Sequence, residues 1–346
     1  MRVPCLPLVM LLLTASCVSA PATPEIVPSA ATGIERALQS SVSLVVDDGG
    51  RADGFGSAIV LNEQGYLVTA HHVVDGAMGI TVLMAGGRAA VARVVAEDPV
   101  GDIAILQTTF VPEAMVPATA ASGCAVGDEV ISVGNPFGTS RLGGSPSVAR
   151  GIVSASSRSF VSEKTGRVYL DCIQHDAPTN PGNSGGGIFN ARGQLLGMNV
   201  LINTPQDTAS ESGVAFALPA AALLYAAQRL LAGEKIHHGW LGARGYRGVL
   251  WMNSLGLGRL GTMLREVEDG SPAYQAGMQA GDVIVSVTWW PGPNAKTWPA
   301  SLDVERRDWL LVEDALPVGQ QVKVKISRGG RELDFSLTVA DRTLRR

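Results

Sequence analysis

The stretch Thr179-Asn-Pro-Gly-Asn-Ser-Gly-Gly186 places one serine, Ser184, among glycines. A serine hydroxyl is a weak nucleophile near neutral pH, so it needs a base that accepts its proton and donors that bind the oxyanion formed on the attacked carbonyl. Gly182 and Gly185 permit the sharp turn and close backbone approach that such donors require. The stretch therefore predicts a nucleophile loop, with an ordinary turn of the same composition as the alternative.

A base and an acidic partner occur earlier in the chain. Two of the five histidines, His71 and His72, end an apolar, strand-like run. Thirty residues after His72, Asp102 opens another apolar run, so its carboxylate can be buried at the start of a strand. Such a carboxylate can hold an imidazole tautomer and stabilise the imidazolium. His71 and Asp98 are the alternatives, although the proline after Asp98 biases that aspartate to an extended turn.

The order His, Asp, Ser in these contexts resembles that of the chymotrypsin-like serine proteases. The motifs Thr69-x-x-His72-Val-Val and Gly182-Asn-Ser-Gly-Gly resemble those of the HtrA (Deg) branch. The resemblance implies that His72 is the general base, that Asp102 orients it and that Ser184 is the nucleophile. It also implies that the N–H groups of Gly182 and Ser184 form the oxyanion hole. It implies no cofactor.

Strand-like runs separated by turn residues fall into two sets of six. The first set lies near residues 41–46, 54–61, 66–69, 80–84, 89–96 and 102–107, and the second near 129–133, 148–155, 168–174, 185–189, 195–203 and 213–218. A helical pattern follows at Leu218–Leu231, with Gly233 as its C-cap. We expect a mainly β fold of two six-stranded antiparallel β-barrels, chymotrypsin-like, with the reactive residues in the cleft between them.

The chain beyond the helix resembles a PDZ domain of α+β type. Gly239-Trp-Leu-Gly242 resembles the carboxylate-binding loop, so Trp240, Leu241 and Gly242 are expected to bind peptide. The segment Glu268–Ile284 resembles the Ser-Pro-Ala and Gly-Asp-x-Ile segment of such domains, and Val322–Val339 reads as a closing hairpin. A PDZ groove adds an extended peptide as a strand and captures its terminal carboxylate. Polypeptide substrates and peptide C-termini are therefore the expected partners.

The N-terminus has the layout of a secretory signal, with Arg2 and then an apolar run. Val18-Ser-Ala20 resembles an ordinary cleavage site, whereas Leu13-Thr-Ala-Ser-Cys17 resembles a lipobox that would lipidate Cys17. We therefore expect export to the bacterial periplasm or cell envelope, with a lipid anchor and a soluble form as the two alternatives. The expected division is a signal at 1–20, an N-terminal segment at 21–40, a peptidase domain at 41–233 and a PDZ domain at 238–342.

Composition narrows the function classes. A formal net charge of −4 and a pI near 5.8 give no basic footprint for nucleic acid. No Cys or acidic cluster with metal spacing accompanies the paired histidines, so no metal site is expected. Cys124 and Cys172 remain after removal of the signal, as a disulfide or as two separate thiols. His175 and the pair His237-His238 are predicted at polar surface or linker positions.

The expected function is that of an HtrA-like serine endopeptidase which cleaves unfolded or misfolded envelope proteins, with a PDZ domain that binds peptide C-termini and regulates activity. Pro178 stands where trypsin-like relatives place the aspartate that selects Arg or Lys, so no pocket for a basic residue is expected. The resemblance to the family implies cleavage after small or medium aliphatic residues. Residues 21–40 lack the aromatic side chains that trimeric relatives pack between subunits, which leaves the oligomeric state open. The alternative is a peptide-binding chaperone or scaffold with a latent protease site.

Overall fold

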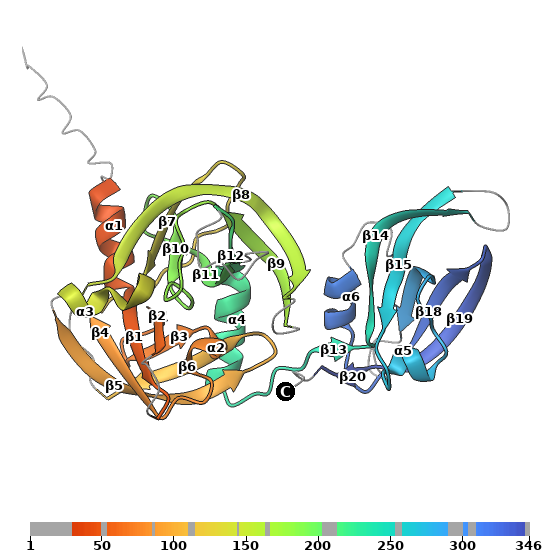
Figure 1. The fold of residues 1–346 in the computed structure, drawn as a ribbon, viewed down its shortest axis with the longest axis horizontal. Helices are drawn as coiled ribbons and strands as arrows, with labels where there is room; N and C mark the ends of the chain where they lie inside the picture. Colours follow the sequence, from red (N-terminus) through yellow and green to blue (C-terminus); the bar gives the residue numbers. More distant parts are fainter. Residues whose placement is uncertain are drawn as a thin grey trace, which may run out of the picture.

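The structure is a computed structural model that describes residues 30–49, 54–84, 87–109, 115–143, 145–162, 167–202, 213–252, 258–289, 300–303 and 309–342. Helix α1 (Ala30–Gln39) leads into a closed antiparallel barrel with the strand order β1-β2-β3-β6-β5-β4 (Figure 1). Its strands are β1 (Ser41–Asp47), β2 (Gly54–Val60), β3 (Tyr66–Thr69), β4 (Gly79–Met84), β5 (Arg88–Asp98) and β6 (Ile103–Thr108), and the short helix α2 (His71–Val74) follows β3. Burial alternates along β4, because successive side chains of a strand point to opposite faces of the barrel wall.

A second closed barrel has the order β10-β11-β12-β9-β8-β7. Its strands are β7 (Glu129–Gly134), β8 (Ser147–Val161), β9 (Val168–His175), β10 (Gly187–Phe189), β11 (Leu195–Ile202) and β12 (Ala215–Pro219), with the short helices η1 (Pro136–Gly138) and α3 (Ser140–Gly143) between β7 and β8. Helix α4 (Ala220–Leu231) contacts β5 and β6 of the first barrel as well as β11 and β12 of the second. Its buried face, which includes Leu223 and Leu230, joins a core shared by both barrels. The helix therefore fixes the two halves against each other.

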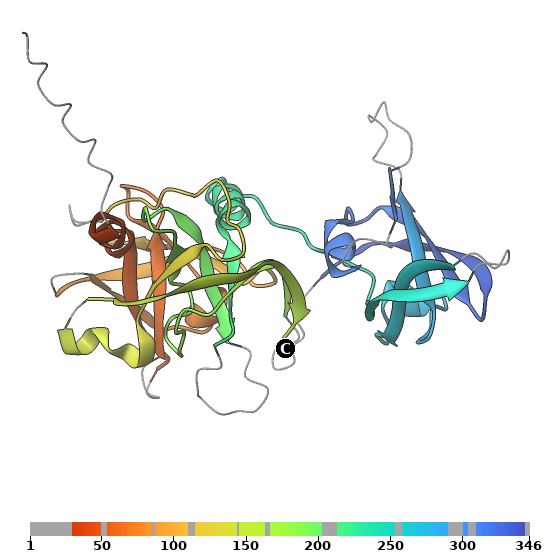
Figure 2. The same ribbon diagram turned by 90° about the horizontal axis from the view of Figure 1, so that it is seen from above.

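A second body lies beside the barrels and is joined to them by residues 232–238 (Figures 1 and 2). Its main sheet has the order β14-β15-β16-β18-β19, with β17 paired to β16, and a small second sheet pairs β13 with β20. The elements are β13 (Gly239–Trp240), β14 (Ala243–Met252), β15 (Gly258–Val267), α5 (Pro272–Gln275), β16 (Val283–Trp289), β17 (Ala300–Asp303), α6 (Trp309–Ala315), β18 (Gln321–Arg328), β19 (Arg331–Thr338) and β20 (Ala340–Asp341). Strand β14 lies at an edge of the main sheet, and α6 is on the side that faces the second barrel (Figure 1).

These observations confirm the predicted fold class of two six-stranded barrels followed by an α+β domain. Several strand boundaries differ from the expected ones, among them those of β10 and β8. Strand β10 begins at Gly187 rather than at residue 185, because residues 181–185 form tight turns. Strand β8 continues to Val161, beyond the expected residue 155, since register shifts let it follow β9 as it bends. Helix α1 was not anticipated from the sequence.

His175 and the two cysteines of the barrels are placed by the structure. His175 is fully buried rather than at the surface, because the side chain of Asn199 supplies a partner 2.9 Å from its Nε2 atom. Cys124 and Cys172 are both free thiols. The signal and lipidation predictions for residues 1–20, including Cys17, fall outside the described residues. Within the described part of the chain, no helix has the length and apolar character needed to cross a membrane.

Candidate active site

His72 and Asp102 come together at the end of the first barrel. Helix α2 starts directly after β3, and Asp102 lies directly before β6, which pairs with β3. The His72 Nδ1 atom lies 2.8 Å from Oδ2 and 3.1 Å from Oδ1 of Asp102. The backbone N–H of His72 also donates to Oδ1 at 3.0 Å. Because Nδ1 faces the carboxylate, the Nε2 atom of the ring remains available on the other side.

The Asp102 carboxylate is fully buried, yet four different groups surround it. Besides the two His72 groups, the hydroxyl of Tyr169 donates to Oδ2 at 2.8 Å and the guanidinium of Arg167 lies 3.1 Å from Oδ1. Burial alone would raise the pKa of Asp102, but the hydrogen bonds and charge of His72 and the charge of Arg167 lower it below its ordinary value. The group is therefore an anion at neutral pH.

Tyr169 keeps its proton in this setting. Burial and the adjacent Asp102 charge raise the pKa of the phenol far above its ordinary value. Neither Tyr169 nor Arg167 was picked out from the sequence. Both belong to the region around β9, more than sixty residues after Asp102 in the chain, so only the closure of the second barrel brings them to this carboxylate.

Ser184 lies in the loop before β10, and its side chain is half-buried. Its Oγ atom lies 3.5 Å from the carbonyl oxygen of Val200, the one hydrogen bond that the described residues give this hydroxyl. The structure thus contains no hydrogen bond between Ser184 and His72. Catalytic hydrogen bonds are often long or poorly aligned before substrate binds and tighten in the complex.

Glycine is needed at position 182 of this loop. Gly182 has φ = 100°, and a Cβ atom there would lie 2.1 Å from the carbonyl oxygen of Asn135. The loop is held from the first barrel, since the Ser57 N–H donates to the Ser184 carbonyl at 2.9 Å and the Ser57 hydroxyl donates to the Gly182 carbonyl at 2.8 Å. No group among the described residues accepts a hydrogen bond from the N–H of Gly182 or of Ser184. These two donors are therefore free to bind an oxygen atom from outside.

The alternative base and acid lie elsewhere. His71 is buried and its Nε2 atom is 3.4 Å from Glu97, so it does not face Asp102. Asp98 contacts Nε2 of His238 at 2.9 Å, on the side of the first barrel that meets the PDZ-like body. His238 therefore lies in the linker, and its side chain takes part in the contact between the two bodies. The described residues contain no group of three or more His, Cys, Asp or Glu side chains that could hold a metal ion.

The predicted carboxylate loop already holds a carboxylate. The N–H groups of Leu241 and Gly242 donate to Oε1 of Glu313 at 2.8 and 2.9 Å, and the N–H of Ala243 does so at 3.5 Å. Trp240 is half-buried beside them. Glu313 was not identified from the sequence. Trp309 and Glu313 are four residues apart, so the sequence places them on the same face of one helix. This spacing does not show which part of the chain that face contacts.

Known protein families match both parts of the chain. The trypsin-like peptidase domain family matches residues 56–198, and the PDZ domain family matches residues 264–287. The first match contains His72, Asp102 and Ser184. The second contains the end of β15, all of α5 and most of β16. The order of the two matches along the chain is the order of the two bodies in the structure.

Curated relatives share both parts. A probable periplasmic serine endoprotease DegP-like of Pseudomonas fluorescens is 31% identical over 294 residues, which cover 83% of this chain and 56% of the relative. The serine protease Do-like HtrB of Bacillus subtilis is 32% identical over 297 residues, which cover 82% of this chain and 60% of the relative. The chain thus spans about half the length of the curated relatives it matches.

Solved structures extend the likeness over about nine-tenths of the chain. The HtrA-type protease AlgW with tripeptide superposes with a TM-score of 0.69 at 29% identity, covering 91% of this chain and 98% of that one. A serine endoprotease from Yersinia pestis gives a TM-score of 0.63 at 26% identity, covering 92% of this chain and 100% of that one. With a trypsin-like peptidase domain and a PDZ domain in the same order as in these proteins, the chain belongs to the HtrA family of serine proteases.

Proposed function

We propose that the chain is a serine endopeptidase that cleaves polypeptides with the triad His72, Asp102 and Ser184. The observation that carries the proposal is the buried Asp102 carboxylate bonded to Nδ1 of His72, 2.8 Å away, because this contact leaves Nε2 as the basic atom. The relatives are named a serine endoprotease and a serine protease, and these names favour this function over a peptide-binding scaffold with a latent site.

The proposed reaction begins with attack of the Ser184 Oγ atom on the scissile carbonyl while Nε2 of His72 accepts the hydroxyl proton. The new C–O bond forms a tetrahedral oxyanion, which the free N–H groups of Gly182 and Ser184 bind. His72 then gives the proton to the leaving amine as the C–N bond breaks. A water molecule, deprotonated by His72, releases the acyl group and restores the Ser184 hydroxyl.

Arg167 and Tyr169 act as positioning residues in this proposal. Tyr169 donates a hydrogen bond to Asp102 and Arg167 forms an ion pair with it, so the carboxylate cannot rotate away from His72 without breaking two buried polar contacts. Their role is to keep the Nδ1 proton of His72 facing Asp102 throughout the reaction. The arrangement is one in which charged and polar groups are paired before substrate arrives, as preorganised catalysis requires.

The substrate class and location are finer proposals. We infer that the substrates are unfolded or misfolded proteins of the cell envelope, cleaved after small or medium aliphatic residues. Export is supported by a relative that is named periplasmic and by the signal pattern of residues 1–20. We further propose lipidation of Cys17, a peptidase domain at 41–233 and a PDZ domain at 238–342 that binds polypeptide C-termini through residues 240–242.

Cleavage of casein by purified residues 21–346 tests the central proposal. The wild-type protein should degrade casein, and Ser184→Ala should show no cleavage above background. A fluorophosphonate probe, which reacts with activated serines, should label the wild type and leave Ser184→Ala unlabelled. Casein cleavage by Ser184→Ala at a rate near that of the wild type would refute the assignment of the nucleophile.

A further inference from the structure

Helix α6 presents two side chains to the carboxylate loop of the PDZ domain. Glu313 is only 2% exposed, and its Oε1 atom accepts hydrogen bonds from the N–H groups of Leu241 and Gly242, with that of Ala243 at the limit of bonding distance. Trp309, one helical turn earlier, is also 2% exposed, and its indole N–H donates to the carbonyl of Ala243 at 2.6 Å. The two shorter contacts of Glu313 lie in the loop just before β14, and that of Trp309 lies on the first residue of β14, the edge strand of the sheet.

These contacts reproduce what the end of a bound peptide would offer. A peptide captured by such a loop places one carboxylate on successive backbone N–H groups and extends the sheet by pairing its own N–H and C=O groups with the edge strand. Glu313 supplies the carboxylate. Trp309 supplies an N–H to the first carbonyl of the edge strand, Ala243. The loop donors and this acceptor are therefore satisfied from within the chain.

We propose that Glu313 and Trp309 are an internal ligand of the PDZ domain, which a polypeptide with a free, apolar C-terminus must displace in order to bind. This inference rests on the proposed binding of C-termini by the loop. A peptide whose terminus is amidated lacks the charge that Glu313 supplies, so it cannot take the place of Glu313. A ligand of this loop must therefore carry a carboxylate that can replace the carboxylate of Glu313.

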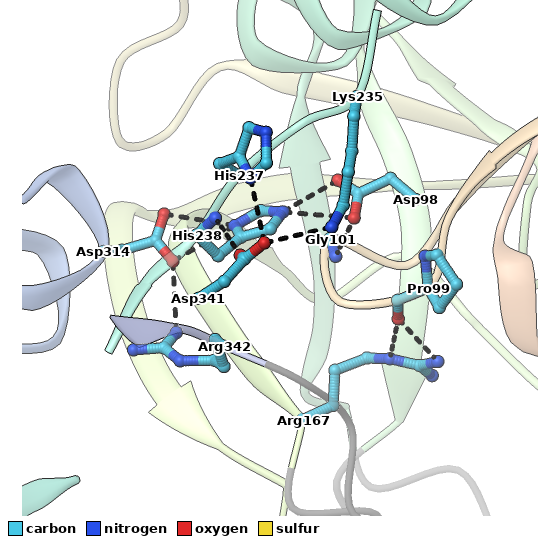
Figure 3. Close-up of polar contacts among 10 residues, drawn as sticks. All are labelled: Asp98, Pro99, Gly101, Arg167, Lys235, His237, His238, Asp314, Asp341 and Arg342. Carbon is cyan, nitrogen blue, oxygen red and sulfur yellow. Dashed lines mark hydrogen bonds and ion pairs between the residues drawn. The ribbon is translucent and has the colours of Figure 1, made fainter. Parts of the chain in front are cut away.

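Neighbouring charges hold the internal ligand in place. The Nη2 atom of Arg342 lies 2.9 Å from Oε2 of Glu313, and its Nη1 atom lies 3.1 Å from Asp314, the next residue of α6. Asp314 also contacts Nδ1 of His238 at 3.1 Å, and Nε2 of the same ring contacts Asp98 of the peptidase domain at 2.9 Å (Figure 3). Withdrawal of Glu313 with its helix would therefore disturb a chain of ion pairs that reaches the first barrel.

Binding of a labelled decapeptide that ends in a free valine carboxylate, and of its amidated twin, tests the proposal in the full mature chain. If the internal ligand fills the loop in about 90–99% of molecules, Glu313→Ala should bind the free peptide about 10- to 100-fold more tightly than the wild type. The amidated peptide should bind equally weakly to both proteins. Glu313→Gln, which keeps the shape but loses the charge, should show a smaller gain and serves if Glu313→Ala does not fold.

Asp282→Ala is the matched control. Asp282 is a buried carboxylate of the same domain, 1% exposed and 2.7 Å from Arg328, but it does not touch the loop. The Asp282→Ala variant should bind the free peptide with the same affinity as the wild type. In addition, N-acetyl-leucine should raise the melting temperature of Glu313→Ala, whereas N-acetyl-leucine amide should not.

Equal affinity of wild type, Glu313→Ala and Glu313→Gln for the free peptide would overturn the internal ligand. So would an equal gain for the free and amidated peptides, because the gain would then not depend on the carboxylate. Casein cleavage by the same wild-type sample reports the peptidase function separately. Failure of this inference can therefore be told from failure of the proposed function.

Discussion

Asp102 in the peptidase domain and Glu313 in the PDZ domain are two buried carboxylates with closely similar surroundings. Asp102 accepts one backbone N–H group and Glu313 accepts several, and each faces an arginine, Arg167 in one case and Arg342 in the other. The difference lies in the remaining partner. Asp102 also holds His72, whose ring is about one-third exposed, whereas Glu313 is enclosed entirely by its donors. A buried carboxylate can thus prepare a neighbour for chemistry or occupy a site that another carboxylate would bind.

The largest expected effect is on kcat, when the carboxylate that orients the base is changed. In Asp102→Asn, the amide would favour the wrong tautomer of His72, so kcat should fall by about 10⁴. Casein cleavage under saturating substrate measures this loss. Asp282→Asn, which alters another buried carboxylate beside an arginine, should keep its turnover. A loss of less than tenfold in Asp102→Asn would mean that Asp102 does not orient the base.

The second effect concerns stability in the PDZ domain. Arg342→Ala would leave Glu313 buried without its cation, which should lower the free energy of unfolding by about 3–5 kcal/mol. Urea unfolding followed by tryptophan fluorescence reports this domain, because all six tryptophans lie between residues 240 and 309. The double variant Arg342→Ala/Glu313→Gln should recover part of the loss. Equal stability of the wild type and Arg342→Ala would show that backbone donors alone compensate the Glu313 charge.

The same two carboxylates show how far the sequence could be interpreted. His72, Asp102 and the Ser184 loop could be proposed because each is marked by a local pattern: a strand end, a strand start and a glycine-rich turn. The twelve barrel strands could be predicted for the same reason, since apolar runs between turn residues are local. Glu313 could not be placed, because its partners at 241–243 lie about seventy residues away and the contact depends on how α6 docks.

Tyr169 and Arg167 could not be predicted as part of the site for a similar reason. Their sequence context is that of an ordinary strand, and their function depends on the second barrel closing against the first. His175 was misassigned to the surface because a histidine in a strand gives no indication of a buried partner such as Asn199. Buried polar contacts across barrels are thus the part of the site that local patterns do not encode.

A third prediction concerns His238, which links the two carboxylate regions through Asp98 and Asp314. Burial alone would lower the pKa of His238, but its hydrogen bonds to Asp314 and Asp98 and their charges raise it to about 9. The folded pKa exceeds the unfolded value of about 6.5, so the contact should stabilise the docked domains fully below about pH 6.5 and lose this contribution as the pH rises through 9. Arg342, which pairs with Asp314, and Asp341, which accepts the His238 backbone N–H, complete the charged surroundings.

Small-angle scattering or hydrogen exchange of residues 232–238 can follow this docking between pH 6 and pH 10. The wild type should open as the pH rises, with a change in docking free energy on the order of 1–3 kcal/mol. His238→Gln should have lost this pH dependence and be more open already at pH 6. His237→Gln is a suitable control, since that ring is half exposed and contacts Asp341 rather than Asp98. A pH-independent wild type would remove His238 as the link between the two regions.

The smallest expected effect tests whether the donors around Asp102 act on the chemistry or only on the fold. Tyr169→Phe removes one hydrogen bond to Oδ2 and leaves the His72 and Arg167 contacts in place, so kcat/KM should fall by about fivefold, corresponding to about 1 kcal/mol. The loss should appear in kcat with KM unchanged, because Tyr169 acts on the base through Asp102 and does not contact the substrate. Tyr225→Phe, which alters an exposed tyrosine on α4, should change neither quantity. A lower melting temperature in Tyr169→Phe with an unchanged kcat would assign Tyr169 to packing alone, and the similarity between the Asp102 and Glu313 sites would then be limited to their arginines and backbone donors.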